Sequence, residues 1–169
     1  MINSIMGRQL HPVGMQQQAK RAQLLSGSAP NKLFQNEALV IDKWFALQAG
    51  APDRAGDVLP RVRQLMQHPD FSLRNPNRAR SLIFSYCSAN PAGFHRPDAA
   101  GYVYWSEQVL ALDAINPQVA ARLARAMDRW SRLAEPYRSA AKVAIERVAA
   151  KTDLSNDVRE VISRALSAA

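Results

Sequence analysis

The chain has 169 residues, of which 47% are hydrophobic and 21% charged, a balance typical of one globular domain. Its single cysteine, Cys87, excludes an internal disulfide, and no apolar run approaches the ~20 residues that a membrane-spanning helix needs. The formal net charge is +8, but beyond the first thirty residues the basic side chains alternate with Asp and Glu. We therefore expect a soluble, cytoplasmic protein with an arginine-rich surface, and this charge distribution does not favour nucleic acid as its partner.

Residues 1–30 differ in character from the rest of the chain. They include a run of three glutamines at 16–18 and a segment of small residues at 26–30, and they contain no acidic residue. Because they show no sustained hydrophobic period, we predict a flexible segment with at most one weak helix at 15–25. Apolar periodicity begins after Asn31, so residues 31–169 are predicted to form the helical domain.

The first strongly apolar helix is predicted near residues 38–49 and stops near Gly50. Its large apolar residues are Leu39, Ile41, Trp44, Phe45 and Leu47. Such a helix is too apolar to end a stack of helices, so we expect an exposed apolar patch there and self-association through it. A second helix follows, for which Asp57 can serve as the N-cap.

The dipeptide Asn-Pro occurs three times in the middle of the chain, beginning at Asn75, Asn90 and Asn116. Asn accepts hydrogen bonds from the free amides of a first helical turn, and Pro has no amide to leave unsatisfied there. The dipeptide therefore predicts three helix starts. Gly93 and Pro97 limit the second of these helices to a single turn, whereas residues 117–130 have the clearest amphipathic pattern of the chain.

Three further helix starts are predicted at Asp98, Pro136 and Ser155. About seven helices joined by short turns, with no segment of strand period, predict an all-α fold of antiparallel helix pairs. The pairs recur at roughly 40 residues, within the range of two-helix repeats. This spacing favours a short superhelical solenoid of the HEAT or armadillo type over a single bundle.

The residue types that carry chemistry are scattered. His11, His68 and His95 are isolated from one another, without the His-Glu-x-x-His spacing or the three or four convergent ligands of a zinc site. Cys87 lies on the apolar side of its helix, which favours a buried structural thiol. We predict no catalytic residue and no metal ligand in this chain. A cluster of aromatic residues that could stack bases is assigned instead to the core: Tyr102, Tyr104 and Trp105.

Two arginines, Arg78 and Arg80, lie in the first turns of the helix that follows Asn75. The helix dipole opposes positive charge at this end. Either acidic side chains of a neighbouring helix pair with the two arginines, which is the favoured interpretation, or they face the carboxylate of a ligand. Arg122 lies one turn further into the helix that follows Asn116, and the same argument applies to it less sharply.

Four segments are distinctive beyond their helical pattern: ALVIDKWFALQA at 38–49, NPNRARSLI at 75–83, NPAGFH at 90–95 and NPQVAARL at 116–123. In order and spacing they resemble the C-terminal helical domain of bacterial aminopeptidase N, the alanyl aminopeptidase of the zinc gluzincin family, from about residue 36 to residue 169. The resemblance implies a superhelical domain that covers the active-site cavity of a larger enzyme and shapes peptide access. It also implies that Arg80 and Arg122 project into that cavity, near substrate carboxylates.

In the resembled family the zinc ligands and the catalytic glutamate lie in a separate domain, whose motifs are absent from this sequence. We therefore expect a non-catalytic fragment whose partner is the remainder of the aminopeptidase chain, with zinc held only there and peptides in the shared cavity. Two alternatives stay open. One is a free-standing helical-repeat adaptor for a protein or peptide, and the other is a basic nucleic-acid-binding module that uses Arg122, Arg125, Arg129 and Arg132.

Overall fold

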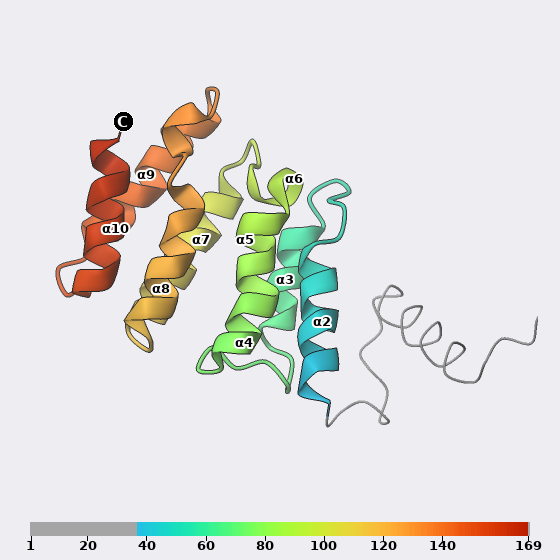
Figure 1. Cartoon of the computed structure of the whole chain (residues 1–169). Coiled ribbons are helices and arrows are strands. Elements are labelled where there is room, and N and C mark those ends of the chain that lie inside the picture. Colours follow the sequence, from blue (N-terminus) through green and yellow to red (C-terminus); the bar gives the residue numbers. More distant parts are fainter. Residues whose placement is uncertain (1–36, 169) are drawn as a thin grey trace, which may run out of the picture.

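The structure, a computed structural model, describes residues 37–168. These residues form helices joined by turns and contain no strand (Figure 1), which confirms the predicted all-α class. The predictions for residues 1–30, including the weak helix at 15–25, lie outside the described residues. The proposed boundary at residue 31 therefore stays a prediction.

The first half of the described chain contains α2 (Ala38–Ala49), α3 (Val58–Leu65) and a continuous helix built from α4 (Pro76–Ala79), a π-helical turn (Arg80–Phe84) and α5 (Ser85–Ala89). A single turn, α6 (Pro91–Phe94), leads to the second half, which contains α7 (Ala100–Asp113), α8 (Pro117–Ala124), α9 (Tyr137–Ala149) and α10 (Asn156–Ser167). Two short 3-10 turns, Arg125–Met127 and Trp130–Arg132, connect α8 to α9.

The helices are arranged in two rows. In Figure 1, α2, α4–α5, α8 and α10 form the front row, and α3, α7 and α9 lie behind them. The most extensive packing joins α2 to the π-helical turn, α7 to both α8 and α9, and α10 to α8. Successive helices therefore stack along one direction, and the predicted array of helix pairs is confirmed.

The core lies between the two rows. Tyr102, Tyr104 and Trp105 of α7 are completely buried, which confirms that the aromatic cluster belongs to the core and not to a stacking platform. The indole nitrogen of Trp105 donates to the carbonyl of Leu123 at 3.0 Å and so ties α7 to α8. Large apolar residues from several helices are buried with them: Trp44, Leu82, Leu123 and Trp130.

The three Asn-Pro helix starts are confirmed by their hydrogen bonds. The Oδ1 atoms of Asn75, Asn90 and Asn116 each accept from an amide of the following first turn, at 3.0, 3.0 and 3.2 Å. Asn90 is also buried, and its Nδ2 donates to the carbonyls of Ala49 at 2.8 Å and Ala51 at 2.9 Å. One side chain therefore starts α6 and holds the end of α2.

The N-cap predicted for α3 is corrected by the structure. Asp57 precedes the helix, but its carboxylate accepts from the amide of Arg54 and pairs with Arg61 at 2.9 Å. The Oδ1 atom of Asp53 accepts from the amide of Val58 at 3.0 Å and satisfies the first turn instead. Asp53 and Asp57 thus lie four residues apart in sequence, and the first amide of α3 is bonded to the more distant of the two.

The helix from 76 to 89 buries side chains every fourth residue, on two adjacent lines. One line contains Ala79, Ile83 and Cys87, and the other contains Arg78, Leu82 and Tyr86. An α-helix has 3.6 residues per turn, so a period of four would drift away from the contact line. The π-helical turn holds more residues in one turn and restores the alignment. Arg80 stands outside this buried surface and is exposed.

Candidate functional site

Arg78 and Arg80 lie two residues apart but have opposite surroundings. Arg78 is 8% exposed, and its guanidinium donates to the carbonyls of Asp70 at 2.9 Å and Ala38 at 3.1 Å and to the carboxylate of Asp42. For Arg78 the structural alternative is therefore confirmed. The positive charge of Arg78 is unfavourable near a helix start, and the carboxylate of Asp42 on α2 compensates it.

The guanidinium of Arg80 is exposed and makes no hydrogen bond or ion pair with the residues that the structure describes. The same holds for Arg122, which stands on α8 opposite the buried Ala120 and Ala124. Within residues 37–168, other exposed arginines share this state, among them Arg147 of α9 and Arg164 of α10. The cavity role that the resemblance implies for these two residues stays a prediction.

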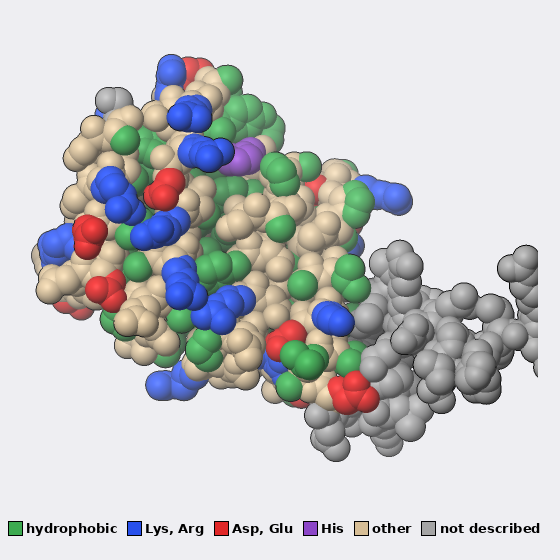
Figure 2. All heavy atoms as spheres, viewed as in Figure 1, with side chains coloured by type: hydrophobic (Ala, Val, Ile, Leu, Met, Phe, Trp, Pro, Cys, Tyr) green, Lys and Arg blue, Asp and Glu red, His purple; other side chains and the backbone are tan. Residues whose placement is uncertain are grey.

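Basic side chains are unevenly distributed over this face. Figure 2 shows that Lys and Arg gather over α8, α9 and α10, whereas the half over α2 and α5 is mostly apolar or uncharged. Four exposed arginines follow one another along α8 and the 3-10 turns: Arg122, Arg125, Arg129 and Arg132. The aromatic residue among them, Trp130, is buried and donates its indole N–H to the carbonyl of Ala165. This arginine run therefore offers charge without an aromatic surface for bases.

The two histidines within residues 37–168 pack against aromatic rings. The ring of His68 lies 5.2 Å from that of Trp44 and 5.7 Å from that of Phe45. The Nδ1 atom of His95 lies 2.8 Å from the hydroxyl of Tyr102, and burial lowers the pKa of His95. Both histidines are half-buried, and each contacts aromatic side chains instead of a second ligand. The third histidine, His11, lies outside the described residues.

No three His, Cys, Asp or Glu side chains converge on a common point within 37–168. Cys87 is buried and its pKa is raised by burial, so the predicted structural thiol is confirmed. The expectation that this chain alone neither binds a metal nor catalyses stays a prediction. In the same part of the chain, no helix is long and apolar enough to cross a bilayer.

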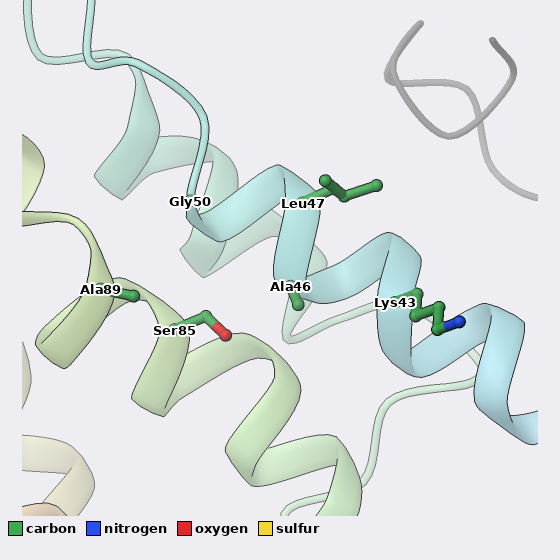
Figure 3. A pocket seen from close by; sticks show the side chains of 6 residues that line it. All are labelled: Lys43, Ala46, Leu47, Gly50, Ser85 and Ala89. Carbon is green, nitrogen blue, oxygen red and sulfur yellow. The ribbon is translucent and has the colours of Figure 1, made fainter. Parts of the chain in front are cut away.

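A groove of about 420 Å³ lies between α2 and α5. Figure 3 shows its lining, in which Ser85 and Ala89 extend from α5 towards α2. The residues that line it are Lys43, Ala46, Leu47, Gly50, Ser85 and Ala89. Apart from the Lys43 ammonium and the Ser85 hydroxyl, these side chains offer a small, apolar surface.

The exposed patch predicted on α2 is wrong for its two aromatic residues. Trp44 and Phe45 are buried, and the ring of Phe45 packs edge-on against Phe71 at 5.8 Å. The segment after α3 folds over them, which the pattern of α2 alone could not show. Leu39 and Leu47 remain 75% and 40% exposed. Self-association through this face stays a prediction.

Comparison with known proteins gives a consistent result. The family model described as "Domain of unknown function (DUF3458_C) ARM repeats" matches residues 9–167. The chain is 42% identical over 133 residues to aminopeptidase N of Caulobacter vibrioides and to that of Haemophilus influenzae, and 42% identical over 137 residues to that of Escherichia coli. These matches cover 79%, 79% and 81% of this chain and 15% of each relative.

Among solved structures, the aminopeptidase A of Legionella pneumophila, in complex with aspartic acid, is similar with a TM-score of 0.74 and 31% identity. The match covers 80% of this chain and 16% of that one. The resemblance to the aminopeptidase N C-terminal domain, and the armadillo-like solenoid that it implied, are thus confirmed. The chain spans about one sixth of the length of the relatives that it matches.

Proposed function

Because the chain belongs to the DUF3458_C family of ARM-repeat domains, we propose that it works as the C-terminal helical domain of an aminopeptidase N-like zinc metallopeptidase. The observation that carries this proposal is the 42% identity to three aminopeptidases N, in matches that span 15% of each. In this role the chain is not itself the catalyst. It covers the active-site cavity of the remaining enzyme and shapes the access of peptides.

The cavity role rests on the resemblance to aminopeptidase N and on the exposed guanidiniums of Arg80 and Arg122, which have no partner within the described residues. An arginine near a helix start is unfavourable unless an anion answers it, and Arg80 has no such partner within the described residues. Arg122 on α8 likewise has no partner in the part of the chain that the structure describes. A peptide in the cavity brings a C-terminal carboxylate, which an arginine can bind with two parallel hydrogen bonds. We assign these two residues to the binding of peptide carboxylates above the site of cleavage.

Zinc would be held by the remainder of the enzyme, as in the family that the chain resembles. The metal would supply an activated water for hydrolysis of the peptide bond. The residues of this chain would orient the far end of the peptide and limit how much of the cavity is open. A cytoplasmic location is part of the same proposal.

A chimera tests this function. The matched region of the Escherichia coli aminopeptidase N is replaced by the corresponding residues of this chain, and hydrolysis of alanyl-p-nitroanilide and of trialanine is measured. We expect zinc-dependent activity on both. Changing Arg80→Ala and Arg122→Ala together should raise the KM for trialanine about 5–10-fold, because only trialanine has a free carboxylate, and leave the KM for the anilide within about twofold.

Arg147→Ala is the matched control, since Arg147 is an exposed arginine of α9 without an ion pair among the described residues. It should leave both KM values unchanged. A chimera that folds and binds zinc but is inactive would contradict the domain assignment. If the chimera is fully active but its KM for trialanine is unchanged by Arg80→Ala and Arg122→Ala together, the cavity role alone is contradicted.

A further inference from the structure

The arginine run consists of four exposed residues between α8 and the second 3-10 turn: Arg122, Arg125, Arg129 and Arg132. It belongs to the half of the molecule over which basic side chains gather (Figure 2). The large apolar residues between its members are buried, namely Leu123, Met127 and Trp130. Because buried and exposed positions recur once per turn, the four arginines lie on the side of the segment that faces away from the core.

The positive charges of the run are not compensated within residues 37–168. None of its guanidiniums has a hydrogen-bond or ion-pair partner there, and Asp128, exposed in the same segment, pairs with none of them. Elsewhere in that range basic side chains do have carboxylate partners, as Arg63 has in Glu107 at 2.9 Å. Like charges one turn apart repel each other, so an anion that lies across the run lowers its energy.

The chemistry of the run favours carboxylates over a nucleic acid or a membrane. Trp130 is buried and its N–H is bonded to the carbonyl of Ala165, so its ring cannot stack on a base. Among the described residues, the exposed large apolar side chains all lie outside 117–132, so the segment has no such group to insert into a bilayer. A guanidinium, in contrast, binds a carboxylate with two parallel hydrogen bonds.

The spacing of the run fits an extended peptide. Its members are three, four and three residues apart, which places them about 4.5–6 Å apart along a helical segment. In an extended chain every second side chain points to the same side, at intervals of about 7 Å. The long, flexible arginine side chains can accommodate the small difference between these two spacings.

We propose that the arginine run binds an extended peptide that carries acidic side chains at alternate positions. Its first member, Arg122, is the residue assigned above to a peptide carboxylate, so the run continues that site along the segment. The inference rests on the proposed function in making this peptide a substrate: acidic peptides are the class that the domain would collect. The binding itself is a property of this chain and can be measured without the remaining enzyme.

Fluorescence anisotropy tests the proposal with the full chain and a labelled peptide of four Glu-Ala repeats. A labelled peptide of four Gln-Ala repeats should bind at least about tenfold more weakly, because its side chains carry no charge for a guanidinium to pair with. Changing Arg125→Gln, Arg129→Gln and Arg132→Gln together should weaken binding of the Glu-Ala peptide about tenfold. Arg122 is left unchanged in this variant, so that the residue assigned to the cavity is not disturbed.

The matched control changes Arg54→Gln, Arg74→Gln and Arg147→Gln together. These three arginines are exposed, and their guanidiniums have no ion pair among the described residues. The control removes the same total charge from other elements, so it should weaken binding of the Glu-Ala peptide by no more than about twofold. Thermal unfolding confirms that both triple variants fold.

Equal weakening by the two triple variants would overturn the proposal, because the peptide would then respond to net charge alone. Equal affinity for the Glu-Ala and Gln-Ala peptides would also overturn it. So would tighter binding of a labelled oligothymidylate of eight nucleotides that is lost in the variant of the run, which would assign the run to nucleic acid. If the chimera described above is inactive while the Glu-Ala peptide still binds, the enzymatic role fails and the peptide-binding surface stands.

Discussion

The guanidinium of Arg78, in the first turn of α4, is bonded to the carboxylate of Asp42 in the middle of α2. Both side chains are largely buried, with 10% and 15% of their surfaces exposed. Arg78 also donates to the carbonyls of Ala38 and Asp70, so one cation connects α2, the loop before α4 and α4 itself. The arginine that looked misplaced in the sequence is thus a structural link between neighbouring helices.

Removing the anion of this pair should be strongly destabilising. Asp42→Ala leaves the Arg78 charge buried without a counter-ion, and we expect a loss of about 3–5 kcal/mol in the free energy of unfolding. Glu146→Ala is the control, because its ion pair with Lys142 is half exposed and 3.8 Å long. It should cost less than about 1 kcal/mol. Urea unfolding measures both, and equal losses would show that the Arg78 pair contributes no more than a surface pair.

Two adjacent residues of α8 should respond very differently to truncation. Leu123 is completely buried, so Leu123→Ala should cost about 2–5 kcal/mol through the cavity that it leaves. Arg122 is exposed and free of ion pairs within the described residues, so Arg122→Ala should cost under about 1 kcal/mol. The measurement is again urea unfolding. Similar losses for the two variants would mean that Arg122 takes part in a structural interaction.

Gly101 should not tolerate even a methyl group. A Cβ atom at this position would lie 2.1 Å from the carbonyl oxygen of Phe94, so α6 and α7 would have to separate. We expect Gly101→Ala to cost more than about 2 kcal/mol. At Gly50 the nearest atom is the carbonyl oxygen of Ala46 at 3.1 Å, and Gly50→Ala should stay within about 1 kcal/mol. A thermal unfolding midpoint of Gly101→Ala equal to that of Gly50→Ala would contradict this close approach.

The free energy of unfolding should decrease at acidic pH because Asp98 becomes protonated. Hydrogen bonds from Arg96 and from the amide of Ala100 hold the pKa of Asp98 at about 2, below its ordinary value of 3.8. Between these values the unfolded chain binds more protons than the folded chain, so the stabilisation is complete above about pH 3.8 and is lost as the pH falls towards 2. Asp98→Asn should therefore flatten the decline of the urea midpoint between pH 4 and pH 2. An unchanged slope would remove Asp98 from the acid response.

Features of the fold that depend on neighbouring residues could be predicted from the sequence. Asn75, Asn90 and Asn116 cap their helices because each side chain reaches an amide only two or three residues away. The amphipathic pattern after Asn116, in contrast, ran to residue 130, whereas α8 ends at Ala124. The indole of Trp130 is bonded to the carbonyl of Ala165, 35 residues away, and no local pattern contains that contact.

The candidate site shows the same limit. The sequence showed that Arg78 and Arg80 both carry positive charge near a helix start. It could not show which of the two has an acidic partner within the chain. Asp42, the partner of Arg78, lies 36 residues earlier in the chain and becomes a neighbour only when α2 packs on α4. The groove between α2 and α5 could not be predicted from the sequence, because its walls come from two helices that are far apart in the chain. The small residues that line it face one another only after the helices pack: Ala46, Gly50, Ser85 and Ala89.

The π-helical turn Arg80–Phe84 holds one residue more than an α-helical turn of the same helix would. Deleting one residue from Arg80–Phe84 would convert the turn into an α-helical one and leave the residues that follow close to their present orientation, whereas a deletion in the α-helical part, Ser85–Ala89, would rotate all that follows by about 100°. Both ends of the helix are fastened to α2, through Arg78 to Ala38 and through Asn90 to Ala49. Because both ends are held, we expect a single-residue deletion within Ser85–Ala89 to be tolerated far less than a single-residue deletion within the π-helical turn.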